Sequence, residues 1–203
     1  MTEDVPELKS LIFDGNGGTQ KEILAAAFEA LHKHGYSELT IDAIGDEFDK
    51  SQSLIYHHYD SKDELLLDLL RFITDYFEDL TPESHMSNPR DRIEEFVETA
   101  IGLSERDRTA IGTLIELRAQ AVHDERYREH FVRSDKAIQK YLADEIRDGI
   151  ESGVFQEVDA ESVAVWIHTV SIGAAFRSST ADDSWVETNK KEVQDYLEKR
   201  LYR

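Results

Sequence analysis

Residues 50–62 form a short stretch that is rich in side chains able to hydrogen-bond to nucleic acid. The stretch contains two lysines, two histidines, one glutamine, three serines and two tyrosines. Lysine and protonated histidine pair with phosphates, whereas glutamine and serine can bond to base edges in the grooves of DNA. Side chains of this kind are suited to nucleic-acid recognition if the fold exposes them on one surface.

Catalytic and metal-binding chemistry is not indicated by the sequence. The chain has no Gly-rich phosphate loop, no nucleophile elbow, no His-Glu-x-x-His motif and no cysteine. His57, His58 and Asp60 are close in sequence, but adjacent residues point about 100° apart on a helix and cannot share one face. We therefore expect no enzyme activity, no metal site and no cofactor.

Two short predicted helices would position the residues of this stretch. Thr40 is the predicted N-cap of the first helix, and Gly45 would let another backbone approach that helix closely. The second helix begins near Ser51, after a turn at residues 49–50. Two short helices joined by a tight turn form the geometry that lays a recognition helix in a major groove. The same pattern also fits a purely structural helical hairpin.

The remainder of the chain is predicted to be helical as well. Apolar residues recur at i, i+3 and i+4 through most of it, and it has only three prolines and ten glycines. A first helix is expected to begin at Thr19, with Glu22 completing a capping box, and to end at Gly35. A second capping box, Ser61 with Glu64, opens a long helix that links this head to a larger body.

The body is predicted from its helix starts and stops. The linker helix should stop at residues 81–82, and Pro89 occupies a first helical position. Further helices should begin at Ser104, Asp124, Asp159 and Ser184. The helix from Ser104 would bury Ile111, Leu114 and Ile115. The last helix carries a stripe that must be buried against something, a partner chain being one candidate: Val186, Val193, Leu197 and Leu201.

Residues 23–66 resemble the DNA-binding head of the TetR/AcrR family of regulators. The matching positions are Ile23-Leu24, Ala26-Ala27, Gly35-Tyr36, Thr40-Ile41-Asp42, Ile44, Ile55-Tyr56-His57-His58-Tyr59, Ser61-Lys62 and Leu65-Leu66. More weakly, residues 126–176 are similar to the C-terminal domain of several members. The resemblance implies an all-α protein with a three-helix helix-turn-helix domain at 19–64. Residues 65–203 would then hold the linker helix and a ligand-binding, dimerising helical bundle.

The resemblance also implies which side chains contact DNA. Gln52 and Ser53 would face base edges. The side chains that would position phosphates are Lys50, Tyr56, His58 and Lys62. His57 could do either, and its protonation would add a phosphate contact. The full set of implied contacts is Thr40, Lys50, Ser51, Gln52, Ser53, Leu54, Tyr56, His57, His58 and Lys62.

Several of these contacts have a structural alternative. Thr40 could serve only as a helix cap, Tyr56 could pack into the core of the hairpin, and Lys62 could be a solvated residue in a first helical turn.

Three positions also depart from the family pattern. Asp49 replaces the usual turn glycine and would need a positive φ. Lys50 replaces a small apolar residue, so it either packs differently or reaches a phosphate.

Leu54 is the third departure, because it stands where the family often has a small polar residue facing bases. Any base reading by Leu54 would be by apolar contact, for example with a thymine methyl group.

For the body, the resemblance implies a cavity that binds an unknown small-molecule effector. The candidate lining residues are Phe96, Arg118, Trp166, His168 and Phe176. Each lies on or near an apolar stripe, so core packing is the alternative role. Residues 173–175 (Gly-Ala-Ala) and the helix from Ser184 to Leu201 are candidates for a homodimer interface. Two-fold pairing predicts a palindromic double-stranded DNA operator, and we expect a ligand-responsive repressor.

The charge of the chain bears on both function and source. There are 43 acidic and 23 basic residues, for a formal net charge of -20, whereas DNA binding normally needs a basic surface. Residues 19–62 carry four basic and eight acidic side chains, a net of -4. A strongly acidic surface also keeps a protein hydrated in concentrated salt, so we expect a halophilic source. The alternative function is an acidic all-helical adaptor that binds basic protein partners.

The location of the protein is also predicted from composition. No run of residues approaches the roughly 18 consecutive apolar positions that a membrane span requires, and the first nine residues lack an apolar signal core. We therefore expect a cytoplasmic protein without membrane contact.

Overall fold

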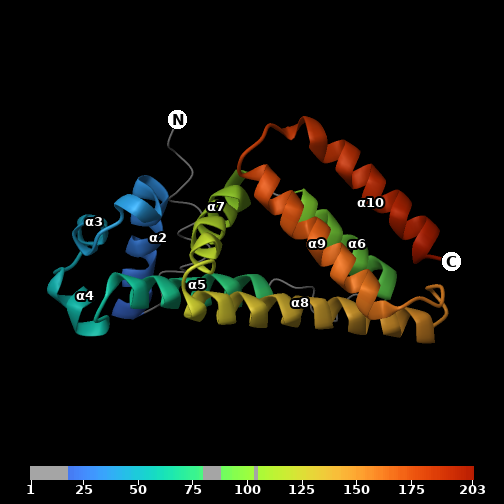
Figure 1. Ribbon diagram of the computed structural model, residues 1–203, viewed down its shortest axis with the longest axis horizontal. Helices are drawn as coiled ribbons and strands as arrows, with labels where there is room; N and C mark the ends of the chain where they lie inside the picture. The colour runs from blue at the N-terminus through green and yellow to red at the C-terminus, as the bar shows by residue number, and fades with distance from the viewer. Residues whose placement is uncertain (1–17, 80–87, 103–104) are drawn as a thin grey trace. The chain divides into compact units, whose positions relative to one another are not determined.

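The computed structural model describes residues 18–79, 88–102 and 105–203, and these are almost entirely helical (Figure 1). The one pairing between extended residues in the described part of the chain is an isolated antiparallel bridge between Phe155 and Tyr202. The all-α fold predicted from the sequence is therefore confirmed. The predicted helix stop at residues 81–82 and the predicted helix start at Ser104 lie outside the described residues.

The chain divides into two compact units. The first consists of Met1–Phe77 with Glu105–Phe131, and the second of Glu78–Ser104 with Val132–Arg203. The first unit therefore extends beyond residues 19–64, the head expected from the sequence, because it also takes in the linker helix and a later segment.

The first unit is built on helix α2 (Thr19–Glu38), which packs against α3 (Ile41–Asp46), α4 (Ser53–His58) and α7 (Glu105–Gln120). It also contains α5 (Lys62–Asp79) and the first turns of α8 (Glu125–Glu151). Its core includes side chains from each of these helices: Phe28, Leu31, Ile44, Ile55, Leu66, Leu70, Leu117 and Tyr127.

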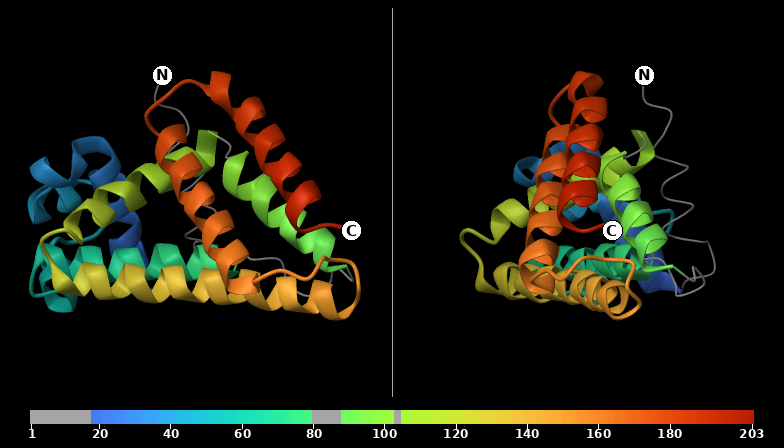
Figure 2. Two further views of the ribbon diagram at one scale, coloured as in Figure 1. Left: turned by 45° about the vertical axis from the view of Figure 1, so that its right-hand side comes forward. Right: turned by 90° about the vertical axis from the view of Figure 1, so that its right-hand side faces the viewer.

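The second unit combines α6 (Pro89–Ile101), the rest of α8, α9 (Ala160–Ser178), a short 3-10 turn (Asp183–Trp185) and α10 (Val186–Arg200). Helix α6 packs against α9 and α10, and these three helices lie side by side in Figure 2. Its core includes Ile93, Leu142, Ile146, Phe155, Ile167, Val193 and Leu197.

Several helix starts follow the predicted capping chemistry. The Thr40 hydroxyl accepts the N–H of Ala43 at 3.0 Å, and Asp159 accepts the N–H of Ser162 at 3.1 Å. Ser61 accepts the N–H of Glu64 at 3.2 Å. Each bond satisfies a donor that the first turn of a helix leaves without an intrahelical partner.

The start of α2 differs from the predicted capping box. Gly18 occupies the N-cap position and makes no side-chain capping bond, so Thr19 is already the first helical residue. The end of α2 also differs. Gly35 has φ 69° and ψ 164°, which kinks the helix, but a short helical segment continues to Glu38. Gly35 therefore interrupts the helix instead of ending it.

The structure corrects the predicted inward face of one helix and identifies what covers the predicted stripe of another. Among the described side chains of α7, Ala110, Thr113 and Leu117 are buried. Of the three predicted residues, Leu114 is half-buried against the core, and Ile111 and Ile115 are half-buried as well, so the inward face is rotated from the expected one. In α10, Val193 and Leu197 are buried in the core of the second unit, as is Leu201 beyond its end. Because the chain itself covers this stripe, the stripe is not free to form a dimer interface.

No helix in the described part of the chain is both long enough and apolar enough to cross a lipid bilayer.

Candidate nucleic-acid interface

Helix α4 has one buried side and one exposed side. Ile55 is fully buried and Tyr59, directly after the helix, is 5% exposed. Tyr56 is 60% exposed, and His57 and His58 are exposed as well. The alternative in which Tyr56 packs into the hairpin core is therefore wrong. Anchoring through Ile55 and Tyr59 leaves an aromatic and imidazole surface facing solvent.

Leu54 lies between these two sides. Its side chain is half-buried and packs against the core of the first unit. Most of its apolar surface is therefore occupied by the protein. Asp49, in the preceding turn, does not adopt the positive φ that the sequence comparison implied. The turn is closed instead by backbone bonds from Glu47 and Phe48 to the carbonyls of Ile44 and Gly45, at 3.2 Å each.

Gln52 and Asp42 connect the two helices of the motif. The amide nitrogen Nε2 of Gln52 donates to Oδ1 of Asp42 at 2.6 Å. Beside them, the hydroxyls of Ser51 and Ser53 hydrogen-bond to each other at 2.8 Å. The contact with Asp42 was not predicted, because no periodicity relates two residues on different helices; Gly45 was the only local signal of close approach.

The two predicted lysine contacts are engaged with the protein itself. The Lys50 ammonium pairs with Glu22 of α2, and both side chains are nearly half exposed. The Lys62 ammonium donates to the carbonyls of Leu39 at 2.9 Å and Tyr36 at 3.5 Å. It also lies 4.9 Å from the centre of the Tyr36 ring. Lys62 is thus a cap for the residues after the α2 kink and not a solvated side chain.

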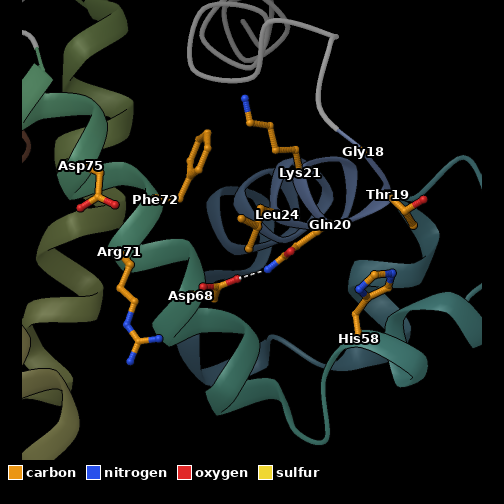
Figure 3. A pocket seen from close by; sticks show the side chains of 10 residues that line it. All are labelled: Gly18, Thr19, Gln20, Lys21, Leu24, His58, Asp68, Arg71, Phe72 and Asp75. Atoms are coloured by element: carbon orange, nitrogen blue, oxygen red, sulfur yellow. Dashed lines mark hydrogen bonds between the residues drawn. The ribbon is translucent and has the colours of Figure 1, made fainter.

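An open groove of about 830 Å³ lies beside α4, between α2 and α5 (Figure 3). Asp68 accepts hydrogen bonds there from Gln20 at 2.8 Å and from the Tyr59 hydroxyl at 2.7 Å. Burial of Tyr59 and its bond to Asp68 raise the pKa of the Tyr59 phenol. These bonds tie the end of α4 to α2 and α5. The lining is Gly18, Thr19, Gln20, Lys21, Leu24, His58, Asp68, Arg71, Phe72 and Asp75.

The five residues expected to line an effector cavity fall in both units. Arg118 lies in the first unit, 4.8 Å from the centre of the Phe131 ring. In the second unit, Trp166 stacks on Tyr196 and Phe96 lies beside Tyr141, with ring centres 3.7 Å and 6.4 Å apart.

The other two members of this set differ in exposure. His168 is 4% exposed and its Nδ1 lies 3.2 Å from the Gln139 amide nitrogen. Phe176 is 55% exposed, which suits a contact surface better than the wall of an interior cavity.

The first unit contains a capped short helix, a tight turn and a second short helix with one exposed polar face. These features define a helix-turn-helix of the DNA-binding class. Comparison with known proteins agrees. Residues 23–69 match the model of bacterial regulatory proteins of the tetR family, and residues 89–201 match the model of the BetI-type transcriptional repressor C-terminal domain. The chain belongs to the TetR family of transcriptional regulators.

Among solved structures, one relative supports the same conclusion and two others share the fold. The chain is similar to a TetR transcription regulator from Haloarcula marismortui ATCC 43049, with 31% identity, a TM-score of 0.83 and coverage of 90% of this chain and 97% of that one. A putative transcriptional regulator from Saccharomonospora viridis, in complex with choline, has 22% identity, a TM-score of 0.81 and coverage of 91% and 97%. A putative TetR-family regulator from Rhodococcus sp. has 22% identity, a TM-score of 0.73 and coverage of 88% and 96%. No curated protein matches the chain.

Proposed function

We propose that this protein is a ligand-responsive transcriptional repressor that binds a palindromic operator as a homodimer, with α4 of each copy in the major groove. The observation that carries the proposal is the exposed face of α4. Tyr56, His57 and His58 are exposed there, while Ile55 anchors the opposite side of the helix. This arrangement supports insertion of α4 into a groove without loss of the core.

Within this proposal the contacts divide by chemistry. Gln52 and Ser53 meet base edges, and Tyr56, His57 and His58 contact phosphates or sugars. Ser51 and Thr40 add contacts to the DNA backbone at the edge of the groove. Leu54 supplies only the part of its surface that the core leaves uncovered.

The two lysines contact DNA only by exchanging partners. For Lys50, a phosphate replaces the Glu22 carboxylate, an exchange that costs little because the pair is exposed. For Lys62, its bonds to backbone carbonyls support a role in positioning the start of α5, with any phosphate contact secondary.

The dimer is proposed to form through the exposed face of α9. Val165, Ile172 and Phe176 recur at i, i+7 and i+11, which places them on one side of a helix. Val165 is 45% exposed and Phe176 is 55% exposed. Gly173 is also exposed and has open space at its Cβ position. Ala174, by contrast, is 4% exposed in the core of the second unit, so it contributes little to a contact between copies.

The effector is proposed to bind in the second unit, where buried polar groups offer it hydrogen bonds. The hydroxyl of Tyr141 is buried and has no hydrogen-bond partner among the described residues, and Phe96 lies beside the ring. Buried polar atoms normally have a partner, so this hydroxyl supports a polar ligand. Choline is a suitable first probe, because the Saccharomonospora viridis relative holds it.

The acidic composition supports a protein that works in concentrated salt. With a formal net charge of -20, repulsion between carboxylates weakens the folded state at low ionic strength. Thermal unfolding in increasing KCl should therefore show a rising midpoint. Greatest stability at low salt would contradict a halophilic source.

The experiment that tests the function is footprinting of the regions upstream of its own gene and the neighbouring genes, in high KCl. Protection of a palindromic site is expected, and replacement of Gln52, Tyr56 and Lys62 together should abolish it. Addition of the effector should release the site. Undiminished sequence-specific binding by the triple variant would show that α4 is not the reading helix, and absence of any protected site would favour the protein-binding adaptor.

A further inference from the structure

We propose that Asp42 determines base specificity by acting through Gln52, so that α4 prefers an adenine–thymine pair at one position in each operator half-site. The inference rests on the proposed function, because it requires Gln52 to meet base edges in the major groove. Asp42 is a positioning residue in this scheme and need not contact DNA.

The contact with Asp42 fixes the orientation of the Gln52 amide. Nε2 of Gln52 lies 2.6 Å from Oδ1 of Asp42. An ionised carboxylate can only accept hydrogen bonds, so the amide nitrogen must face it and the amide oxygen must point elsewhere. The usual ambiguity between the two ends of a glutamine amide is therefore removed.

Gly45 provides the space in which this orientation is held. A Cβ atom at Gly45 would lie 3.0 Å from both Cγ and Cδ of Gln52. The Gln52 side chain therefore lies directly against the backbone of α3, and it is half-buried there. Contact with α3 on one side and a bond to Asp42 at its end restrict the amide to one position before DNA arrives.

The hydrogen-bonding capacity that remains on Gln52 matches adenine. A glutamine amide has two N–H donors and one acceptor oxygen. Asp42 uses one donor, which leaves one donor and the acceptor. Adenine presents one acceptor, N7, and one donor, the N6 amino group, in the major groove, whereas guanine presents two acceptors, N7 and O6. Gln52 held by Asp42 can satisfy both groups of adenine but only one of guanine.

The test measures base preference and not affinity alone. The operator of the full-length protein is selected from a library of random DNA duplexes, and all four base pairs are then compared at each position. The wild type should prefer adenine over guanine at one half-site position by roughly tenfold or more, the value of a good bidentate contact. Gln52→Ala should lose that preference at the same position and at no other.

Asp42→Asn is the decisive variant. Asparagine can either accept from or donate to the amide, so Gln52 is free to turn over, and the preference should fall to within about threefold. Affinity for all sequences should rise, because a negative charge near the DNA backbone is removed. Asp46→Asn is the matched control, since it removes an exposed carboxylate from the same helix. It should raise affinity without changing base preference.

Gly45→Ala provides a second variant that keeps every charge. The added methyl group displaces the Gln52 side chain, while alanine is a better helix former than glycine, so α3 should still fold. Its adenine preference should also fall. In the Gln52→Ala background, Asp42→Asn should have no further effect on base preference.

Different failures have different meanings. If the wild type selects no sequence, the proposed function itself is wrong. If it selects an operator but Asp42→Asn retains the full preference, or shifts preference no differently from Asp46→Asn, the role of Asp42 is overturned while DNA binding stands.

Discussion

The backbone N–H of Tyr36 donates to Oε2 of Glu116 at 2.6 Å, which joins the kink of α2 to α7 within the first unit. The donor is available because Gly35, with φ 69°, interrupts the helical hydrogen-bond ladder immediately before it. A helix interruption normally leaves N–H groups without partners. Here the missing acceptor comes from a carboxylate that lies 80 residues further along the chain.

Glu116→Ala should destabilise the first unit. A hydrogen bond to a charged group contributes about 1.5–3 kcal/mol, and its loss also leaves a partly buried donor unsatisfied. We expect a lower midpoint of urea unfolding and faster amide hydrogen exchange at Tyr36. Glu116→Gln should show a smaller effect, because its side-chain oxygen can still accept.

The control for this prediction is Glu151→Gln, an exposed glutamate at the end of α8. It should leave both measurements unchanged. If exchange at Tyr36 is as slow in Glu116→Ala as in the wild type, the carboxylate does not hold the kink.

Substitution with methionine should reduce stability much more at Lys62 than at Lys50. Lys62→Met removes a donor from the Leu39 and Tyr36 carbonyls and should lower the free energy of unfolding by about 1–2 kcal/mol. Lys50→Met removes only an exposed ion pair and should change it by less than about 1 kcal/mol, while weakening DNA binding. Chemical denaturation and operator titration of both variants check this. Equal loss of stability in the two would contradict the capping role of Lys62.

Buried tyrosines predict loss of stability in alkali. Burial is the main cause that raises the pKa of Tyr59, Tyr127 and Tyr202 above the ordinary value near 10. The folded state therefore holds these protons more tightly than the unfolded state. The resulting stability is present in full below pH 10 and is lost as the pH rises, at up to about 1.4 kcal/mol per pH unit for each tyrosine.

Denaturation midpoints measured between about pH 8 and pH 11 test this slope. Tyr59→Phe should be less stable at neutral pH, since the bond to Asp68 is lost, but should show a shallower decline above pH 10. Appearance of tyrosinate absorbance for all buried tyrosines before any loss of helicity would contradict the prediction.

Local signals in the sequence were sufficient for most of the fold. Thr40, Ser61 and Asp159 cap helices because their side chains satisfy nearby N–H groups, an effect that depends on a few adjacent residues. The exposed side of α4 was not settled by the sequence, because Tyr56 fitted either the hairpin core or a surface facing DNA. Burial of Ile55 and Tyr59 in the structure decides between the two. The predicted capping box of Thr19 and Glu22 is absent, because the helix already includes Thr19 and its N-cap is Gly18, which has no side chain to accept a hydrogen bond.

What could not be predicted depends on contacts between distant segments. Asp42 and Gln52 lie on different helices, and Glu116 meets Tyr36 only after the first unit has folded. Periodicity identifies a face that must be buried, but it does not identify what buries it. The stripe of α10 illustrates this limit, because its own unit covers Leu197 where a partner chain was considered.

The exposed face of α9 predicts where the dimer can be broken. Phe176→Ser and Val165→Ser each replace a side chain about half exposed in the single chain, so neither should greatly change the stability of the second unit. If α9 faces its copy, an aromatic anchor at the interface contributes 2 kcal/mol or more, and Phe176→Ser should weaken dimerisation by roughly thirtyfold.

Val122→Ser is the control, since Val122 is 68% exposed in the first unit. Sedimentation equilibrium measures the association, and a dimer unaffected by Phe176→Ser and Val165→Ser combined would place the interface on another surface. Operator affinity should fall in parallel with the dimer fraction, because each half-site alone is held by a single α4.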